Sequence, residues 1–224
     1  MSAVLYLHGF ASSSQGRKVA ALEAILAPEG VAIDAPDLNA PSFALLDFDA
    51  MVDRARDAAR DRPPDVMAGS SLGALVALAL ARHLPAVPLV LIAPALGFGR
   101  RWIEKLPPGD PVPFFHHGAN REIPIHRKFF TGMAGRCVEA APPAAPVSVV
   151  MGARDESVPI DAVRGVWERW KGSGALDPRS RFVELPGGDH GLTEFVGDLA
   201  AEIRLALGKA RPGPPRPDGL PASR

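Results

Sequence analysis

A serine in a glycine-rich segment is the first residue of this sequence that could do chemistry. Ser71 lies in Gly69–Gly73, which reads GSSLG and fits the pattern G-x-S-x-G. Between a strand and a helix this pattern forms a nucleophile elbow, in which small residues on either side leave room for a strained turn. Such a turn exposes the serine hydroxyl above a sheet. We therefore predict that Ser71 is a nucleophile; the alternative is a glycine-rich turn whose serine caps a helix.

A serine hydroxyl is a weak nucleophile and needs an adjacent base. Of the six histidines, His190 is the best placed, because it lies in the loop GGDHG between the last predicted strand and the last predicted helix. A loop at the carboxyl end of a strand shares the sheet edge at which Ser71 would lie. His83 is near the end of a predicted helix. His116 and His117 are neighbours with no accompanying carboxylate cluster, so we predict no metal site there.

The imidazole in turn needs an acid that holds its tautomer and stabilises its charged form. Asp155 follows a predicted strand in the segment GARD, again at a carboxyl end. The chain order Ser71, Asp155, His190 is the order that α/β-hydrolases use. Three other acids compete for this role: Glu156, Asp161 and Asp189. We choose Asp155 and keep Glu156 as the main alternative, because a side chain next to the histidine points away from it and Asp161 begins the next predicted helix.

Acyl transfer also needs two N–H donors for the oxyanion of its tetrahedral intermediate. The backbone N–H of Leu72 is one candidate, because Leu72 follows the nucleophile at a helix N-terminus. The second candidate is the N–H of Phe10, in the loop His8-Gly9-Phe10 after the first predicted strand, where glycine allows a close turn. We expect His8 to brace this loop and to take no part in proton transfer.

The elements that position these residues alternate between short apolar runs and amphipathic segments. We predict strands at residues 3–7, 31–35, 65–68, 87–93, 147–151 and 181–185. We predict helices at residues 15–27, 45–60, 71–83, 160–171 and 191–207. Uniformly apolar strands that alternate with helices are typical of a parallel sheet covered on both faces. The expected fold class is α/β, with a mostly parallel, doubly wound sheet.

Two stretches interrupt this alternation. Residues 97–136 are rich in Pro, Phe and Arg, and we expect a small, partly helical lid inserted into a domain that spans 1–207. The lid has six aromatic residues and seven Lys or Arg against three Asp or Glu. It could form an apolar acyl pocket with a cationic rim for acyl groups on an anionic carrier, or simply anchor its rings to the core. The segment 208–224 is Pro-rich, and we expect a disordered tail.

Composition excludes several classes of protein. The 25 basic and 25 acidic residues balance, which argues against a general nucleic-acid-binding protein. The longest apolar run, 74–81, is far shorter than the roughly 18 residues of a membrane span. Cys137 is the only cysteine, and phosphate-binding motifs are absent from the sequence. With no positively charged leader, the expectation is a soluble, cytoplasmic protein.

Five separated motifs resemble those of the α/β-hydrolase superfamily, and most of all the YqiA-type bacterial esterases. They read LYLHGFASS, PDL, GSSLGA, GARDESVP and GGDHG, in the order of that family, and the resemblance covers residues 3–207. It implies Ser71 as nucleophile, His190 as base and Asp155 as acid, with Phe10 and Leu72 as oxyanion donors. It also implies a hydrolase without a cofactor.

The function we predict is cleavage of small carboxylic esters by a serine hydrolase through an acyl-enzyme intermediate. The same residues would also serve a thioesterase or an acyl transferase. An alternative from another class is a hydrolase fold that binds a partner without catalysis. That alternative would gain support if the lid closed the pocket or if His190 pointed away from Ser71.

Overall fold

The computed structural model describes residues 1–208 and contains a parallel sheet of six strands. Their bounds are Ser2–Leu7 (β1), Val31–Asp34 (β2), Val66–Ser70 (β3), Leu89–Ile92 (β4), Val147–Gly152 (β7) and Arg181–Leu185 (β8). The spatial order is β2-β1-β3-β4-β7-β8, and every neighbouring pair is parallel. The α/β class and the doubly wound sheet are confirmed. The predicted tail, 208–224, lies outside the described residues except for Gly208.

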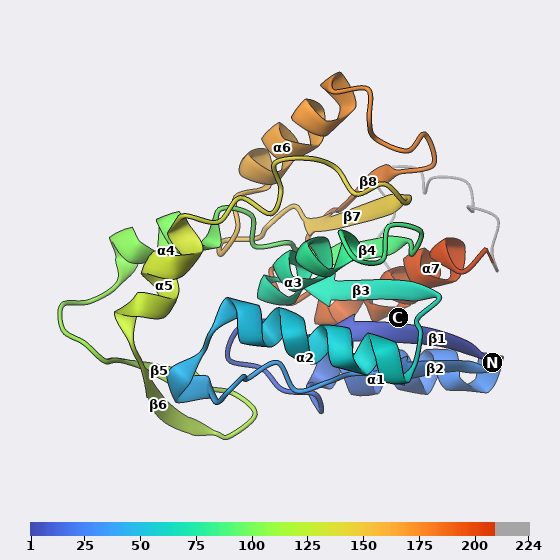
Figure 1. The fold of residues 1–224 in the computed structure, drawn as a ribbon. Coiled ribbons are helices and arrows are strands. Elements are labelled where there is room, and N and C mark those ends of the chain that lie inside the picture. The colour runs from blue at the N-terminus through green and yellow to red at the C-terminus, as the bar shows by residue number, and fades with distance from the viewer. Residues whose placement is uncertain (209–224) are drawn as a thin grey trace.

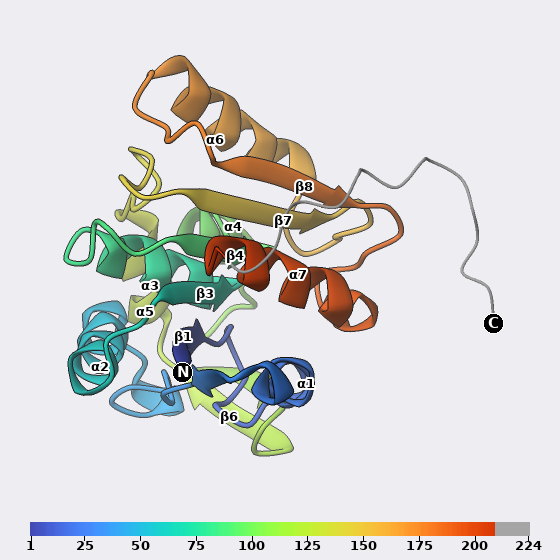
Figure 2. The same cartoon turned by 90° about the vertical axis from the view of Figure 1, so that its right-hand side faces the viewer.

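Helices cover both faces of the sheet, which explains why its central strands are apolar throughout. Their bounds are Arg17–Leu26 (α1), Phe48–Asp61 (α2), Leu72–Ala81 (α3), Ile160–Gly172 (α6) and Val196–Ala206 (α7). Helices α1 and α7 pack together on one face, and α2 and α3 pack together on the other (Figure 1, Figure 2). Strands β3, β4 and β7 lie between these layers and are buried along their whole length.

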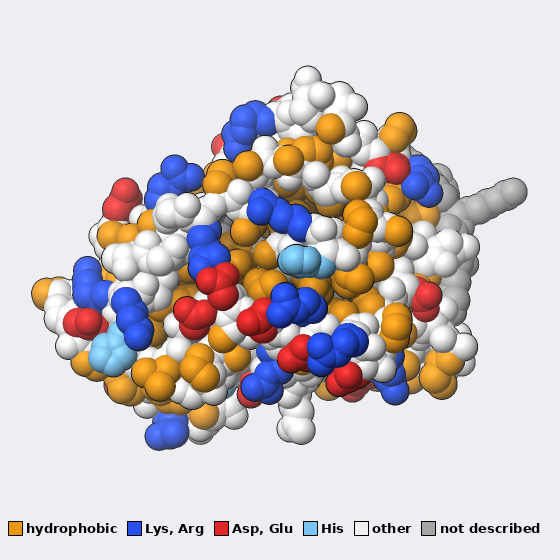
Figure 3. Space-filling view, viewed as in Figure 1, with side chains coloured by type: hydrophobic (Ala, Val, Ile, Leu, Met, Phe, Trp, Pro, Cys, Tyr) orange, Lys and Arg blue, Asp and Glu red, His pale blue; other side chains and the backbone are white. Residues whose placement is uncertain are grey.

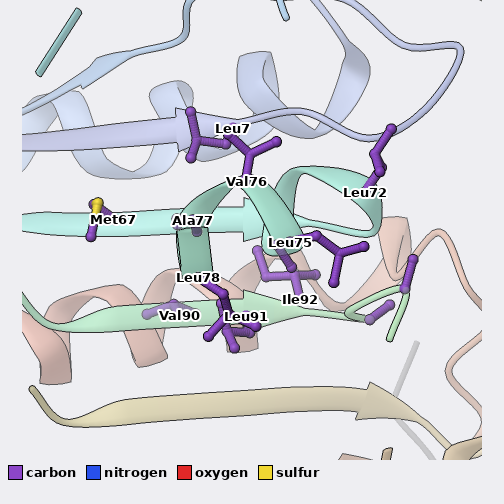
Figure 4. Packing of buried hydrophobic residues seen from close by; sticks show 14 of the residues in the cluster. Leu7, Met67, Leu72, Leu75, Val76, Ala77, Leu78, Val90, Leu91 and Ile92 are labelled. Carbon is purple, nitrogen blue, oxygen red and sulfur yellow. The ribbon is translucent and has the colours of Figure 1, made fainter. Parts of the chain in front are cut away.

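Helix α3 is buried on almost every side, as its alanine- and leucine-rich sequence requires. Figure 4 shows Val76 and Leu78 of this helix among core residues of the strands, including Leu7 of β1 and Leu91 of β4. Close packing of this kind resists displacement, because a shift of the helix would open voids. The turn that carries Ser71 between β3 and α3 therefore rests on a rigid support.

The lid segment, residues 97–136, leaves the sheet after β4 and lies beyond the carboxyl ends of the strands (Figure 1). Its elements are α4 (Phe98–Lys105), β5 (Val112–His116), β6 (Arg121–Ile125) and α5 (Arg127–Ala134). We expected helices here but not the antiparallel hairpin of β5 and β6. Pro113 pairs with Pro124 across it, and prolines argue against a strand in a sequence pattern. A two-stranded ribbon tolerates them because both of its strands are edges.

The first residues of two helices, α2 and α7, also differ from those predicted. Helix α2 begins at Phe48, three residues later than predicted, because the side chain of Asp47 caps it by accepting the N–H of Ala50 at 2.9 Å. Helix α7 begins at Val196, after a short 3-10 turn, so the loop that carries His190 is longer than predicted. Of the helices within residues 1–208, none combines the length and the apolar character that crossing a bilayer requires.

Candidate active site

The turn between β3 and α3 holds Ser71 in a strained backbone conformation. Ser71 has φ 54° and ψ −116°, a region that residues with a side chain rarely adopt. Its N–H donates to the carbonyl of Ile92 on β4 at 2.9 Å, which holds the turn in place. A Cβ atom at Gly69 would lie 2.5 Å from the carbonyl oxygen of Gly73. The expectation that this turn needs small residues is therefore confirmed.

Three side chains from three loops form one hydrogen-bonded chain. His190 Nε2 lies 3.0 Å from Ser71 Oγ, and His190 Nδ1 lies 2.8 Å from Asp155 Oδ2. The other oxygen of Asp155 accepts the N–H groups of Ser157 and Val158 at 2.9 and 2.8 Å. A carboxylate in this position accepts a hydrogen bond from Nδ1–H, which keeps the proton on Nδ1 and leaves Nε2 able to accept the serine proton. The structure thus brings the three predicted residues together.

The competing acids do not reach the imidazole. Glu156 is exposed, and Asp161 forms an ion pair with Arg164 on the surface of α6. Asp189 accepts the N–H of Leu192 at 2.8 Å, which shapes the loop that carries the histidine. By contrast, the side chain of Asp155 has 0% exposure, so its charge acts on the imidazole with little screening by water.

The loop after β1 lies against the nucleophile. A Cβ atom at Gly9 would be 3.2 Å from the Cβ of Ser71, so this glycine permits a close approach. Phe10 follows it, and Leu72 is the first residue of α3. Within residues 1–208, neither the N–H of Phe10 nor the N–H of Leu72 donates a hydrogen bond to the chain itself. Both predicted donors are therefore without a hydrogen-bond partner in the described part of the chain.

His8 supports this loop from within. It is 2% exposed, and its Nε2 accepts the N–H of Leu38 at 2.9 Å while Nδ1 lies 2.9 Å from the carbonyl oxygen of Gly9. Asp37 lies 3.3 Å from Nε2, and its contact with His8 is the main cause that lowers the pKa of Asp37 to about 2. These contacts fit the expected bracing role of His8.

The side chain of Lys18 is a titratable group near the site that we did not predict from the sequence. The Nζ of Lys18 on α1 donates a hydrogen bond of 2.9 Å to the Oγ of Ser70, the residue before the nucleophile. Burial lowers the pKa of Lys18 to about 8, although Asp189 and Asp155 oppose the shift. A sequence signal existed, because Lys18 stands four residues before Leu22 and so lies on the apolar stripe of its helix.

The lid packs on the site through the ring of Phe10. Ring centroids within 6.3 Å of it belong to Phe43, Phe98, Trp102, Phe114, Phe129 and Phe130. Among the lid cations, Arg136 pairs with Asp49 on α2, and Arg127 donates to the carbonyl of Pro107. These contacts favour the simpler expectation that the rings anchor the lid.

Neither the lid histidines nor any other described residues suggest a metal site. His116 is buried against the ring of Phe43, and burial lowers its pKa, while His117 is exposed. Within the described part of the chain, no three His, Cys, Asp or Glu side chains gather as a metal ion would require. The exposed side of α2 carries alternating acidic and basic side chains, and several of them form ion pairs along the helix (Figure 3).

Comparison with known proteins identifies the family and the fold of this chain. Residues 3–205 match the sequence profile of a family described as Uncharacterised protein family (UPF0227). None of the curated proteins matches the chain with significance. Among solved structures, Est1E from Butyrivibrio proteoclasticus with bound ferulic acid is 20% identical, with a TM-score of 0.72 over 94% of this chain and 90% of that one.

Two further structures share the fold. The alpha/beta hydrolase domain-containing protein 10 from mouse is 19% identical, with a TM-score of 0.72 over 92% of this chain and 90% of its own. The monoacylglycerol lipase of Paleococcus ferrophilus is 16% identical, with a TM-score of 0.70 over 93% and 95%. At such low identity the likeness establishes the fold, and it confirms the α/β-hydrolase architecture.

Proposed function

This chain belongs to the uncharacterised protein family UPF0227, a family with the α/β-hydrolase fold, and we propose that it is a serine hydrolase that cleaves carboxylic esters. One observation carries the proposal: the hydrogen-bonded chain from Asp155 through His190 ends on the hydroxyl of Ser71, at a strained turn. This is the arrangement that converts a serine into a nucleophile on unrelated folds. A serine placed only to cap α3 would not need this chain, and its side chain makes no such cap.

In the first half of the reaction, Ser71 Oγ attacks the carbonyl carbon of the ester and its proton passes to His190 Nε2. The carbonyl electrons move to the oxygen, and the N–H groups of Phe10 and Leu72 stabilise the resulting oxyanion. Asp155 stabilises the imidazolium without becoming protonated. When the carbonyl re-forms, the alcohol departs with the proton from Nε2 and leaves an acyl group on Ser71.

In the second half, water repeats these steps. His190 Nε2 takes a proton from the water as its oxygen attacks the acyl carbon, and the oxyanion forms again between the same two N–H groups. Collapse of this intermediate breaks the bond to Ser71 Oγ, which recovers its proton from the imidazolium. A carboxylic acid leaves, and every group that the scheme uses comes from this chain.

A fluorophosphonate probe tests this proposal, because it reacts covalently only with an activated serine. We expect the folded protein to be labelled, with the adduct mapped to Ser71 by mass spectrometry of peptides. His190→Ala should abolish labelling, whereas His83→Ala, an exposed histidine after α3, should label like the wild type. A folded wild-type protein that stays unlabelled would overturn the proposal and favour a non-catalytic binding protein.

The choice of acid is tested by a matched pair of neighbours. Asp155→Asn should lower kcat by about 10⁴-fold, because the amide favours the wrong imidazole tautomer. Glu156→Gln makes the same change one residue later, on an exposed side chain, and should leave kcat unchanged. Steady-state ester hydrolysis by both variants is the measurement. A large loss in Glu156→Gln with little loss in Asp155→Asn would reverse the assignment.

Thioester cleavage is the second candidate, because the same groups would serve it. Est1E holds ferulic acid, an aromatic acid, and the partly exposed rings of Phe10, Trp102 and Phe114 in this chain would suit an acyl group of that kind. We expect aromatic and apolar acyl esters to be turned over fastest. A thioester on an anionic carrier that reacts no faster than the neutral oxygen ester of the same acyl group would exclude a carrier-dependent thioesterase.

A further inference from the structure

Lys18 places an ammonium group beside the strand end that carries the nucleophile. Its Nζ donates a hydrogen bond of 2.9 Å to Ser70 Oγ, and Ser70 is the last residue of β3. Ser70 is only 7% exposed, and its side chain counteracts the rise that burial causes in the pKa of Tyr6 on β1. The ammonium is therefore tied to the strand immediately before Ser71.

The nearest acidic charges belong to the two loops that carry the acid and the base of the site. Asp155 follows β7, and Asp189 immediately precedes His190. Both carboxylates act on the Lys18 ammonium through space and favour its charged form. Asp155 is already bonded to His190, and Asp189 to the N–H of Leu192. The positive charge of Lys18 thus acts on both carboxylates, and Arg101 on α4 also acts on Asp155.

We propose that Lys18 is a positioning residue of this site, an inference that rests on the proposed function. Through Ser70 its ammonium holds the strand end that carries Ser71, and its charge offsets the carboxylates of Asp155 and Asp189 beside His190. Without this positive charge the two carboxylates beside the base would be less compensated, so the pH profile of the reaction should change.

A purely structural role does not explain why a cation stands here. Burying an ammonium disfavours folding, and the pKa of Lys18, lowered from 10.5 to about 8, reflects this cost. Because the unfolded chain binds the proton more tightly, the cost is fully present below pH 8 and is relieved as the pH rises towards 10.5. A methionine of similar length avoids it, so Lys18→Met should fold at least as stably at pH 7.

Other charges around α1 are engaged elsewhere. Helix α7 packs against α1, and its Arg204 bonds to Glu29 while its Glu202 lies 3.6 Å from Arg181. The remaining acids on elements packed against α1 are Asp34 on β2 and Asp198 on α7. Variants at position 18 change none of these groups, so a shift in a pH profile reports the ammonium itself.

The test compares Lys18→Met, Lys18→Arg and Ser70→Ala with the wild type. For each we would measure kcat and KM of ester hydrolysis from pH 5 to 10, together with the Tm. Lys18→Met should lower kcat by about 10- to 100-fold with little change in KM, and move the acidic limb of the profile to higher pH. Lys18→Arg, which keeps the charge, should restore the position of that limb.

Two further variants separate the charge from its hydrogen bond. Ser70→Ala keeps the ammonium and removes its acceptor, so kcat should fall while the acidic limb stays in place. Lys171→Met makes the same substitution as Lys18→Met on the exposed side of α6 and should behave like the wild type.

A Lys18→Met protein with wild-type kcat and an unmoved acidic limb would overturn the inference, while fluorophosphonate labelling at Ser71 left the proposed function intact. A Lys18→Met protein that melts far below the wild type, with Ser70→Ala fully active, would show a structural role and also overturn it. A wild-type protein that neither reacts with the probe nor cleaves esters would overturn both proposals.

Discussion

Ser71→Ala is expected to reduce kcat for ester hydrolysis by about 10⁵- to 10⁶-fold. The substitution removes the only atom that forms a bond to the acyl carbon of the substrate, so His190 has no serine proton to accept. The N–H groups of Phe10 and Leu72 would remain, and donors of this kind leave a residual rate of about 10³- to 10⁴-fold over water. Because the components act as one unit, adding His190→Ala to Ser71→Ala should cost little more.

Steady-state assays of the hydrolysis of a chromogenic ester measure this loss of kcat. Ser42→Ala is the matched control, since Ser42 is exposed and its side chain forms no helix cap. Circular dichroism and Tm should be unchanged in Ser71→Ala, because Ser71 is held mainly through its backbone N–H. A Ser71→Ala protein that keeps more than a tenth of the wild-type kcat would contradict the role of Ser71 as nucleophile.

Gly73→Ala is expected to lower the free energy of unfolding by at least about 4 kcal/mol. Among point substitutions, losses of this size occur only with severe steric clashes or buried polar groups. A Cβ atom at Gly73 would lie 2.5 Å from the carbonyl oxygen of His8 and still closer to that of Leu7. Both oxygens belong to backbone at the end of β1, which cannot move aside as a flexible side chain could. The start of α3 would have to separate from β1, and with it Leu72 from Phe10.

Urea unfolding followed by circular dichroism measures this cost. Gly165→Ala, in the middle of α6, is the control, because the nearest atom to its added Cβ would be the end of the Arg169 side chain at 3.8 Å. There alanine should stabilise the protein by about 0.5–1 kcal/mol through its higher helix propensity. A Gly73→Ala protein as stable as the wild type and labelled normally would show that β1 and α3 are not packed as described.

The parallel sheet and the meeting of the proposed site residues at its edge were predictable because their signals are local. Strands such as β3 and β7 are short apolar runs, and parallel strands bring their carboxyl ends to one edge. Ser71, Asp155 and His190 each follow such a strand end, so their meeting follows from the fold. Local patterns left Glu156 as an alternative to Asp155 because both residues occupy the same loop, and only the turn geometry places one of them against the imidazole.

Local sequence patterns did not predict contacts between residues that lie far apart in the sequence. The hairpin of β5 and β6 pairs two proline-containing strands, and no window of sequence shows that pairing. The ring of Phe10 gathers partners that lie 33 to 120 residues further along the chain, from Phe43 to Phe130. Their convergence decides that the lid is anchored over the loop that carries a proposed oxyanion donor.

Lys18 shows most clearly the difference between what local sequence patterns determine and what tertiary packing determines. The sequence by itself determined the strands and helices of the main sheet, their order along the chain and the residue types at the strand ends, because periodicity and turn chemistry act over a few residues. Whether the ammonium of Lys18 would point into water or toward Ser70 depended on where α1 settles relative to β3, 52 residues away. Tertiary packing alone decided that, because desolvation and charge act through space and not along the chain.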